Sequence, residues 1–408
     1  MNFASTLALP LVVLTFIGVA AGAFPGLKMN RATIALVGAV ALVALQVMPP
    51  SAALKAIDPN TLLLLFAMMI VSAHLRLAGF FDWIGQLLAK HTRSPRLLLA
   101  WIIVAGGLFA ALFLNDTVVI ALTPLVLDLT DRLDRDPLPY LMGLAVAANI
   151  GSTATITGNP QNILIGQSSH IPFTDFLFTL GPVALIGLVI AWAIIMYVYR
   201  GEFNRPWPDG QLVVTERIDY QQLRKCLILI AVMLVAFLVG APIALAAIIA
   251  AATLLVTRRT EPEAVFAQVD WPLLVFFSGL FVVTGVLDYT HLTDRLFALA
   301  EPAIRNGVVP LALIAAGLSN LISNVPAVLL FRSAIPHLAD PRRAWLTLAM
   351  ASTLAGNLTL LGSVANLIVA ETARARGVKL SFREYLRAGV PITLATLATG
   401  ILWLSLVR

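Results

Sequence analysis

The chain contains little charge and a single cysteine. Only 12% of its 408 residues are Asp, Glu, Lys or Arg, and 60% are hydrophobic. Soluble domains carry about 25% charged residues, so this composition excludes a soluble globular protein. The lone Cys226 excludes an intramolecular disulfide and a metal site built from several cysteines. The five histidines form no cluster along the chain, and none is assigned as a metal ligand.

Several catalytic patterns are also missing. The sequence contains no GxxxxGK[ST], HExxH or GxSxG pattern, and no predicted span carries paired acids. These absences argue against an enzyme and against an ATPase within this chain, and we expect no cofactor. The net charge of +6 comes from short Lys and Arg clusters between apolar runs, as the positive-inside bias of membrane proteins predicts. We therefore expect contact with membrane lipid and no nucleic-acid partner.

What the sequence does contain is a series of long apolar runs. A spanning helix needs ~20 predominantly apolar residues, and such runs follow one another with no room for a separate soluble domain. The first segment lacks a basic leader and is interpreted as a retained span. We predict an all-α polytopic membrane protein with about 10 transmembrane helices. They are expected at residues 5–24, 32–49, 60–77, 138–168, 172–199, 226–240, 242–257, 271–288, 344–370 and 386–406.

Two further apolar stretches, residues 97–130 and 308–338, are interrupted at their centres by polar residues. The first is broken by Asn115 and Asp116 and has basic clusters at both ends. A segment that starts and ends on one side must be a re-entrant hairpin, which lipid tolerates only where protein or a wet cavity surrounds the tip. Each hairpin follows an amphipathic segment expected along the membrane surface, residues 80–96 and 291–307.

The distribution of charge predicts the orientation of the chain. Lys28 and Arg31 would place the first loop in the cytoplasm, and the polar linker 201–225 also has cytoplasmic character. This linker divides the chain into two repeats of five spans each, residues 1–200 and 226–408. Because five is odd, the second repeat is inverted relative to the first. The one clear exception to the charge rule in this topology is the pair Arg342 and Arg343.

The two halves share residues as well as topology. Within the predicted broken helices, GNPQNILIG at 158–166 aligns without a gap with GSVANLIVA at 362–370. The same shift carries Thr155 onto Thr359, and the hairpin residue Asn115 corresponds to Asn324 with a small gap. This pattern predicts an inverted repeat of the kind found in secondary transporters.

Gly158 and Pro160 are expected to interrupt the first broken helix. A break frees backbone carbonyls at mid-membrane and exposes the ends of two half-helices, which transporters use to bind ions. Asn159 and Asn162 would supply amide oxygens and donors to a bound solute. In the alternative interpretation, Gly and Pro only kink a spanning helix whose asparagines hold it to a neighbour. Two matched breaks, each paired with an Asn-bearing hairpin, favour the binding site.

In these segments the sequence resembles the ion transporter superfamily. That superfamily includes arsenite efflux pumps of the ArsB type, divalent-anion/sodium symporters, citrate transporters and NhaD-type sodium/proton antiporters. The motifs GNPQNILI, SNVP and GSVANLI look most like small bacterial inner-membrane anion permeases of the YbiR type. The resemblance spans essentially the whole chain. It implies a scaffold domain, a transport domain, a homodimer, and a site for substrate and coupling ion between the hairpin tips and the broken helices.

The resemblance also implies which residues form the site. By position, they are Asn115, Thr117, Gly158, Asn159 and Asn162 in the first half-site and Ser323, Asn324, Gly362, Ser363 and Asn366 in the second. In the related symporters a Ser-Asn-Thr motif in each hairpin, with the following break, forms two sodium sites and a substrate site. Here Leu114 replaces the first Ser, Asp116 intervenes before Thr117, and Val325 replaces the second Thr. These departures put dicarboxylate binding in doubt.

Asp116 is the sharpest single feature of the sequence. An acid near the bilayer centre is costly and is functional by default, so we expect it to carry a transported proton or to help bind a cation. Its charge would repel a dianion and favour a neutral or weakly acidic solute. An Asn-Asp pair at this tip also resembles the arsenite pumps. Alternatively, Asp116 only caps the second helix of the hairpin.

The sequence therefore predicts a secondary active transporter of the bacterial inner membrane. Its expected substrate is a small anion or oxyacid, moved by alternating access and coupled to a gradient of H+ or Na+. One alternative is a sodium/proton antiporter with Asp116 as the ion carrier. Another is an arsenite efflux permease that works with a separate ATPase. A channel would need a continuous polar pathway, whereas the polar residues here gather at four places near the midplane.

Overall fold

The computed structural model describes residues 3–22, 26–207, 218–257, 259–292, 304 and 307–407. The regular elements in these ranges are helices, and six of them are long and apolar enough to cross a membrane. Four more apolar helices in the same ranges are shorter. The architecture confirms the predicted all-α polytopic membrane fold.

The helices of the first half are α1 (Phe3–Ala21), α2 (Arg31–Ala44), α3 (Pro50–Ala56), α4 (Pro59–Leu77), α5 (Phe80–His91), α6 (Pro95–Leu112), α7 (Asn115–Arg132), α8 (Pro137–Ser152), α9 (Pro160–Ser169), α10 (Phe173–Val198) and α11 (Arg200–Phe203). Those of the second half are α12 (Tyr220–Leu238), α13 (Ile243–Leu255), α14 (Pro262–Phe266), α15 (Trp271–Tyr289), α17 (Val308–Ile322), α18 (Asn324–Phe331), α19 (Pro341–Ala355), α20 (Val364–Ala375) and α21 (Phe382–Leu406), with 3-10 turns η1 (Ile335–His337) and η2 (Leu360–Gly362).

The order of elements repeats between the halves. Two helices, a short helix and a long helix are followed by a helical hairpin, a broken helix and a final long helix. The short helices α3 and α14 were not predicted, because they fall in segments that the sequence analysis assigned to loops. Each begins with a proline, which is tolerated in the first helical turn because the missing N–H has no partner there.

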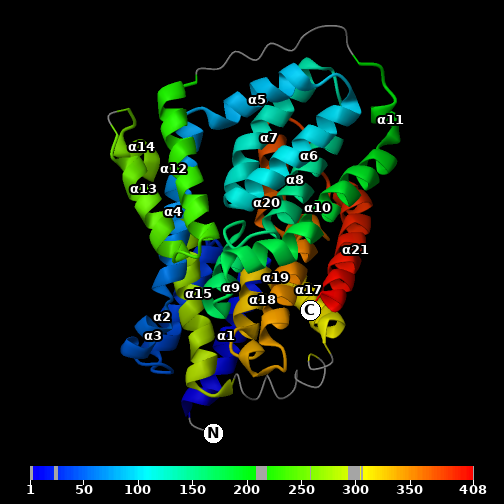
Figure 1. The fold of residues 1–408 in the computed structure, drawn as a ribbon. Helices are drawn as coiled ribbons and strands as arrows, with labels where there is room; N and C mark the ends of the chain where they lie inside the picture. Colours follow the sequence, from blue (N-terminus) through cyan, green and yellow to red (C-terminus); the bar gives the residue numbers. More distant parts are fainter. Residues whose placement is uncertain are drawn as a thin grey trace.

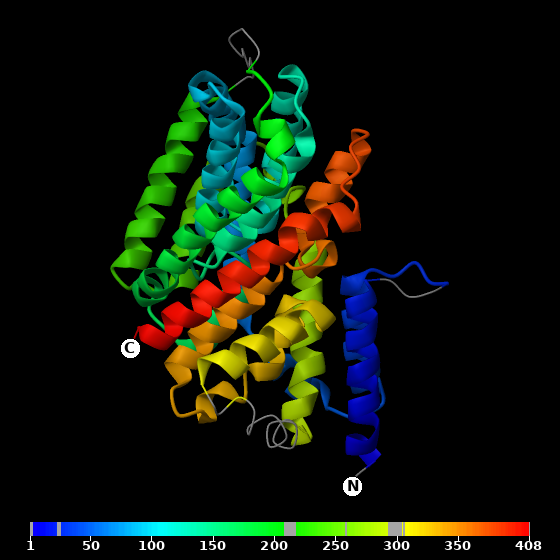
Figure 2. The ribbon, with the colours of Figure 1, turned by 90° about the vertical axis from the view of Figure 1, so that its right-hand side faces the viewer.

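Helices of the two halves cross-pair in a symmetric way. Helix α4 packs against α13, and its counterpart α15 packs against α2 (Figure 1). We call α1–α4 with α12–α15 the scaffold unit, and the two hairpins with the two broken helices the hairpin unit. In the view turned by 90° (Figure 2), α1 stands upright at one edge of the molecule. Helix α21 runs obliquely across the face of the molecule in the same view.

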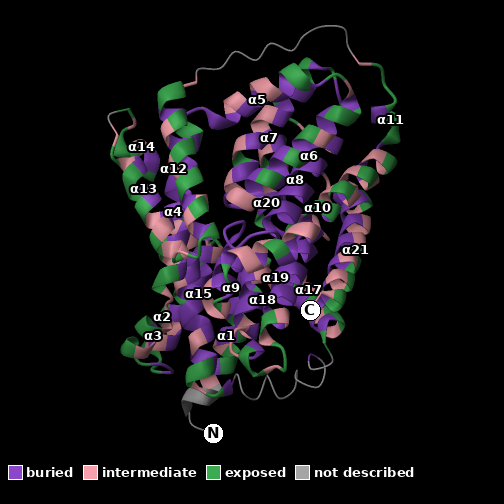
Figure 3. Cartoon of the chain, viewed as in Figure 1, coloured by how far each residue is buried: buried purple, intermediate pink, exposed green. Residues whose placement is uncertain are grey.

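The broken helices form the buried centre of the molecule. Every residue of α8 from Pro139 to Ser152 is buried, as is every residue of α19 from Ala344 to Ala355 (Figure 3). Both helices start in the same way, with an aspartate cap, Asp136 or Asp340, followed by proline. The Asp carboxylate accepts a bond from a free N–H of the first turn, and Pro adds no further orphan donor. The sequence thereby fixes where each broken helix begins.

The outer helices present apolar side chains outward. Phe178, Leu185 and Val189 on α10 are 73%, 67% and 65% exposed. Such a face is stable in contact with lipid and would be a liability in water. The exposed apolar faces, together with the helix lengths, fit a multi-pass membrane protein.

The pair Arg342 and Arg343, which breaks the charge rule, is neutralised locally. The guanidinium of Arg342 pairs with the carboxylate of Asp175 at the start of α10. The Nε atom of Arg343 lies 3.4 Å from Oδ2 of Asp340. The positive-inside rule counts positive residues only, so it does not include these acid partners from the same end of the molecule.

Two predicted segments lie wholly or partly outside the described residues. Residues 208–217 of the linker and all but a few positions of the amphipathic segment 291–307 belong to this group. The first amphipathic segment, 80–96, contains the helix α5. The division into two repeats at the linker stays our interpretation of the order of elements.

Candidate functional site

The tip of the first hairpin rests on the first helix break. Between α6 and α7 the backbone N–H of Asn115 donates to the carbonyl oxygen of Gly158 over 2.9 Å. The side-chain Oδ1 of Asn115 accepts the N–H of Asp116 at 3.0 Å. The hairpin is therefore tied to the break by backbone. Helix α7 begins at Asn115 after the N-cap Leu114, so Asp116 lies in the first turn but is not the N-cap that the alternative interpretation requires.

Asn162 and Asn366 each brace a break in the same way. The amide of Asn162 donates to the carbonyls of Ser152 and Thr155, each at 3.0 Å. The amide of Asn366 donates to the carbonyls of Gly356 and Thr359, at 2.8 and 3.2 Å. These are matched positions of the two halves. We expected Asn162 to supply its donors to a bound solute, but here they satisfy carbonyls freed by the break, which would otherwise be costly in a low-dielectric interior.

Asn159 and Ser363 begin the second half of each broken helix. Oδ1 of Asn159 accepts the N–H of Asn162 at 2.8 Å, and Oγ of Ser363 accepts the N–H of Ala365 at 3.2 Å. Both are therefore N-caps, a role that short polar side chains perform well. The amide of Asn159 also donates to Oγ of Ser152 at 2.9 Å.

Asn149 links the two half-sites and was missed by sequence reasoning. Its Oδ1 accepts from the amide of Asn115 at 3.1 Å and from the hydroxyl of Ser363 at 3.0 Å. Its amide donates to Oδ1 of Asn357 at 2.9 Å and of Asn366 at 3.1 Å. All four bonding capacities of one buried amide are used. The shift that aligns the two nonamers also aligns Asn149 with Thr353. A polar residue at both of these matched positions was the one feature of the sequence that could have indicated Asn149.

The glycines of the two breaks allow backbone segments to approach closely. A Cβ on Gly158 would lie 2.5 Å from the carbonyl oxygen of Ser152 and 2.8 Å from that of Ala110. A Cβ on Gly362 would lie 2.8 Å from the carbonyl oxygen of Gly356. These contacts are with backbone atoms that cannot turn away, so both glycines are required for packing.

The tip of the second hairpin is a single residue, Ser323, with φ of 78°. This left-handed region is unusual for a side chain other than glycine. The adjacent Asn324 places its Oδ1 2.6 Å from Oγ of Ser319, which also lies 3.0 Å from the carbonyl oxygen of Ser352. The second hairpin is thus held to α19 through serine, whereas the first is held to its break directly.

A cavity of 530 Å³ lies where both hairpin tips, both breaks and the scaffold unit meet. Five predicted site residues line it: Asn115, Asp116, Ser323, Asn324 and Ser363. Thr117 instead lines a small neighbouring cavity. The remaining five, Gly158, Asn159, Asn162, Gly362 and Asn366, line none of the cavities described here and are buried in the breaks.

Four polar residues of this cavity were not predicted as site residues: Asn30, Arg31, Gln161 and Asp270. Arg31 and Asp270 come from the scaffold unit and lie within electrostatic range of Asp116. From the sequence, Arg31 is expected only as a loop charge that sets the orientation of the chain. No group of three His, Cys, Asp or Glu side chains in the described ranges could hold a metal ion. The oxygens available for a hard cation come from Asp116, Asp270 and the side-chain amides.

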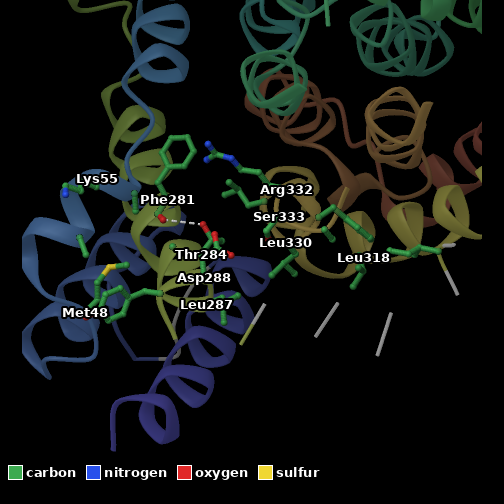
Figure 4. A pocket seen from close by; sticks show the side chains of 18 of the residues that line it. Met48, Lys55, Phe281, Thr284, Leu287, Asp288, Leu318, Leu330, Arg332 and Ser333 are labelled. Atoms are coloured by element: carbon green, nitrogen blue, oxygen red, sulfur yellow. Dashed lines mark hydrogen bonds between the residues drawn. The ribbon is translucent and has the colours of Figure 1, made fainter. Parts of the chain in front are cut away.

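Two further cavities occupy equivalent positions in the two halves. One of 660 Å³ lies between α15 and α18 and is lined by Phe281, Thr284 and Gly285; Figure 4 shows Arg332 and Ser333 facing it from the hairpin side. The other, of 60 Å³, lies between α4 and α7. Its lining residues Met69, Ser72 and Ala73 hold the same places in α4 as those three in α15, since both helices contain 19 residues.

The sequence model of the citrate transporter family, CitMHS, matches residues 12–355. The chain belongs to the citrate transporter family. This confirms the resemblance to the ion transporter superfamily, and it makes the chain a transporter and not an enzyme.

Relatives of this transporter cover nearly its whole length. The silicon efflux transporter LSI3 of Oryza sativa is 33% identical, with 92% of this chain and 93% of the relative aligned. The 46 kDa membrane protein of Mycobacterium leprae is 30% identical over 98% of each chain. A transporter from Dictyostelium discoideum named arsB is 23% identical over 92% of this chain and 87% of its own length.

The fold also matches a solved structure. The YdaH transporter of Alcanivorax borkumensis superposes with a TM-score of 0.59 over 99% of this chain and 98% of that one, at 15% identity. At that identity the match bears on the fold alone, and it agrees with the all-α membrane architecture.

Proposed function

We propose that this transporter is a secondary active permease for a small oxyacid or its anion, driven by a gradient of H+ or Na+. The single observation that carries the proposal is the 530 Å³ cavity in which both hairpin tips meet a cationic and two acidic side chains. Such a cavity offers amide and hydroxyl donors for solute oxygens, and carboxylates for a proton or a metal cation.

The names of the relatives support a compact oxygen-rich solute. The family is described as citrate transporters, one relative as a silicon efflux transporter and another as arsB. Dissolved silicon and arsenite are weak oxyacids, and citrate is a carboxylate, so hydroxylated acids are common to these names. Asp116 favours the weak acids over a trianion, because a fixed negative charge at the tip repels like charge.

The two unequal cavities support alternating access. In an inverted repeat, exchanging the conformations of the halves produces the opposite-facing state. The 660 Å³ cavity would then shrink and its 60 Å³ counterpart would open. We place the protein in a bacterial inner membrane as a homodimer, which accords with the resemblance to bacterial permeases.

The test is uptake into proteoliposomes that contain the purified protein. Silicic acid, arsenite, phosphate, sulfate and citrate are offered separately under an imposed gradient of H+ or of Na+. Accumulation of one solute that collapses with one gradient supports the proposal and identifies both substrate and ion. If every solute only equilibrates across the vesicle membrane, with or without either gradient, the proposal of coupled transport is contradicted.

The rival function is sodium/proton antiport, which the exposure of Asp116 to the central cavity favours. It predicts no solute accumulation, but alkalinisation of acid-loaded vesicles when Na+ is added outside. A pH-sensitive dye trapped in the same vesicles distinguishes the two functions.

A further inference from the structure

Arg31 of the scaffold unit faces the same cavity as the two hairpin tips. It is the first residue of α2, directly after the cap Asn30. Its side chain is half-buried and lies over Gly22, where a Cβ would be 3.6 Å from Nε of Arg31. The cavity that it lines also receives Asn115, Ser323 and Asn324. A cationic group from one unit thus shares a cavity with neutral donors from the other.

The guanidinium of Arg31 has no hydrogen-bond or ion-pair partner within the described ranges. Asp116 attracts it electrostatically, but the two do not form an ion pair within 4.0 Å. By contrast, Arg342 is paired with Asp175. A guanidinium carries five donors in a fixed fork that matches the geometry of oxyanions. A half-buried guanidinium with these donors unused is suited to an anionic ligand.

We propose that Arg31 binds the anionic oxygens of the transported solute from the scaffold side, while the hairpin tips bind it from the other. This inference rests on the proposed function and adds the recognition of negative charge to it. Arg31 also offsets the repulsion between the solute and Asp116. Solute and coupling cation then occupy one cavity, each beside a protein group of opposite charge.

The position of Arg31 makes recognition one-sided. Helix α13 is the counterpart of α2, and it begins at Ile243 after Pro242, with no charged residue. When the halves exchange conformations, this uncharged helix start takes the place of Arg31 beside the solute. The anion therefore binds more tightly on the side to which the present conformation opens, and is released more readily on the other.

The test compares Arg31→Gln, Arg31→Lys and the control Lys28→Gln. Lys28 is exposed, lies just before α2 and lines none of the cavities described here. Its replacement by Gln removes the same charge as Arg31→Gln. Binding is measured first, as thermal stabilisation of the detergent-purified protein by citrate, phosphate and sulfate. Transport follows in proteoliposomes of known orientation, with KM determined separately from each face.

We expect Arg31→Gln to lose the stabilisation and to raise KM on one face about 10-fold or more, because hydrogen bonds to a charged group are lost. Arg31→Lys restores part of the affinity, and Lys28→Gln behaves as wild type. Stabilisation retained in Arg31→Gln overturns the inference, and an equal rise of KM on both faces overturns its one-sidedness. Stabilisation lost in Arg31→Gln while wild type transports nothing supports the Arg31 site and overturns the proposed function. No stabilisation of wild type by any of these anions overturns the Arg31 site.

Discussion

At the residue scale, the two bracing asparagines illustrate how a polar side chain can be essential without touching a ligand. Asn162 and Asn366 are fully buried, and the side-chain amide of each donates to two backbone carbonyl oxygens. In a continuous helix, backbone N–H groups would have satisfied these oxygens. Their role explains why a broken helix is stable inside a membrane protein. It also separates the residues that shape the site from those that line it.

Replacing either bracing asparagine by alanine is expected to destabilise the protein. Asn162→Ala leaves the carbonyl of Thr155 without a donor and that of Ser152 with only the 3.4 Å bond from the amide of Asn159. An unsatisfied buried group costs about 1–3 kcal/mol. Thermal unfolding in detergent, followed by the fraction that remains monodisperse, measures the loss. The control is Asn60→Ala, because Asn60 is exposed at the start of α4. If Asn162→Ala unfolded at the temperature of that control, the brace would contribute nothing to stability.

Asp116 tests coupling at the same scale. Asp116→Asn keeps the size and the hydrogen-bonding backbone of the tip but cannot carry a proton or a negative charge. We expect solute to equilibrate across vesicles without accumulating against its gradient. Asp128→Asn is the matched control, since Asp128 lies on the same helix, is exposed and pairs with Arg376. Unchanged accumulation with an unchanged response to pH in Asp116→Asn would exclude a coupling role.

At the element scale, the positions of the helix breaks can be predicted from the sequence, whereas the residues that contact them are much harder to predict. GNPQN contains the glycine, the cap and the proline of the first break, and its alignment with GSVAN predicted the second. The hub Asn149 could not be predicted to the same degree, because a lone Asn in an apolar run does not indicate its partners. Likewise Arg31 sits between two apolar runs as any loop charge would, and only the packing of α2 against α15 places it beside the hairpin tips.

Gly158 tests the close approach at the first break. Gly158→Ala would force its Cβ against backbone oxygens of Ser152 and Ala110, so the tip must shift, at a cost of about 1–3 kcal/mol or more. We expect reduced stability and loss of transport. Gly317→Ala is the control within the second hairpin, since nothing lies within 4 Å of a Cβ there. Wild-type transport by Gly158→Ala would show that the tip tolerates displacement.

At the scale of the whole molecule, the inequality of the two equivalent cavities is the feature that the sequence could not reveal. Matched motifs predict two similar halves, and similar halves alone would give similar cavities. The structure instead has 660 Å³ on one side and 60 Å³ on the other. A bistable pair of packings explains such inequality, because packed interfaces switch between discrete arrangements.

Single cysteines at equivalent places in these cavities can report the switch. Ser72 and Thr284 hold the same position in α4 and α15. The lone native cysteine, Cys226, is buried and is first replaced by alanine. In the Cys226→Ala background, a small thiol reagent should modify Thr284→Cys quickly and Ser72→Cys slowly. The larger cavity admits the reagent, whereas 60 Å³ does not.

Turnover with substrate and the coupling gradient populates the opposite-facing state. Under those conditions the modification of Ser72→Cys should accelerate while that of Thr284→Cys slows, because a ligand shifts the populations of states that it binds unequally. Unfolding would instead accelerate both, so the opposite signs provide an internal control. Rates that change in the same direction at both positions, or at neither, would mean that the two cavities do not exchange during transport, and the inequality would then be a fixed property of the fold.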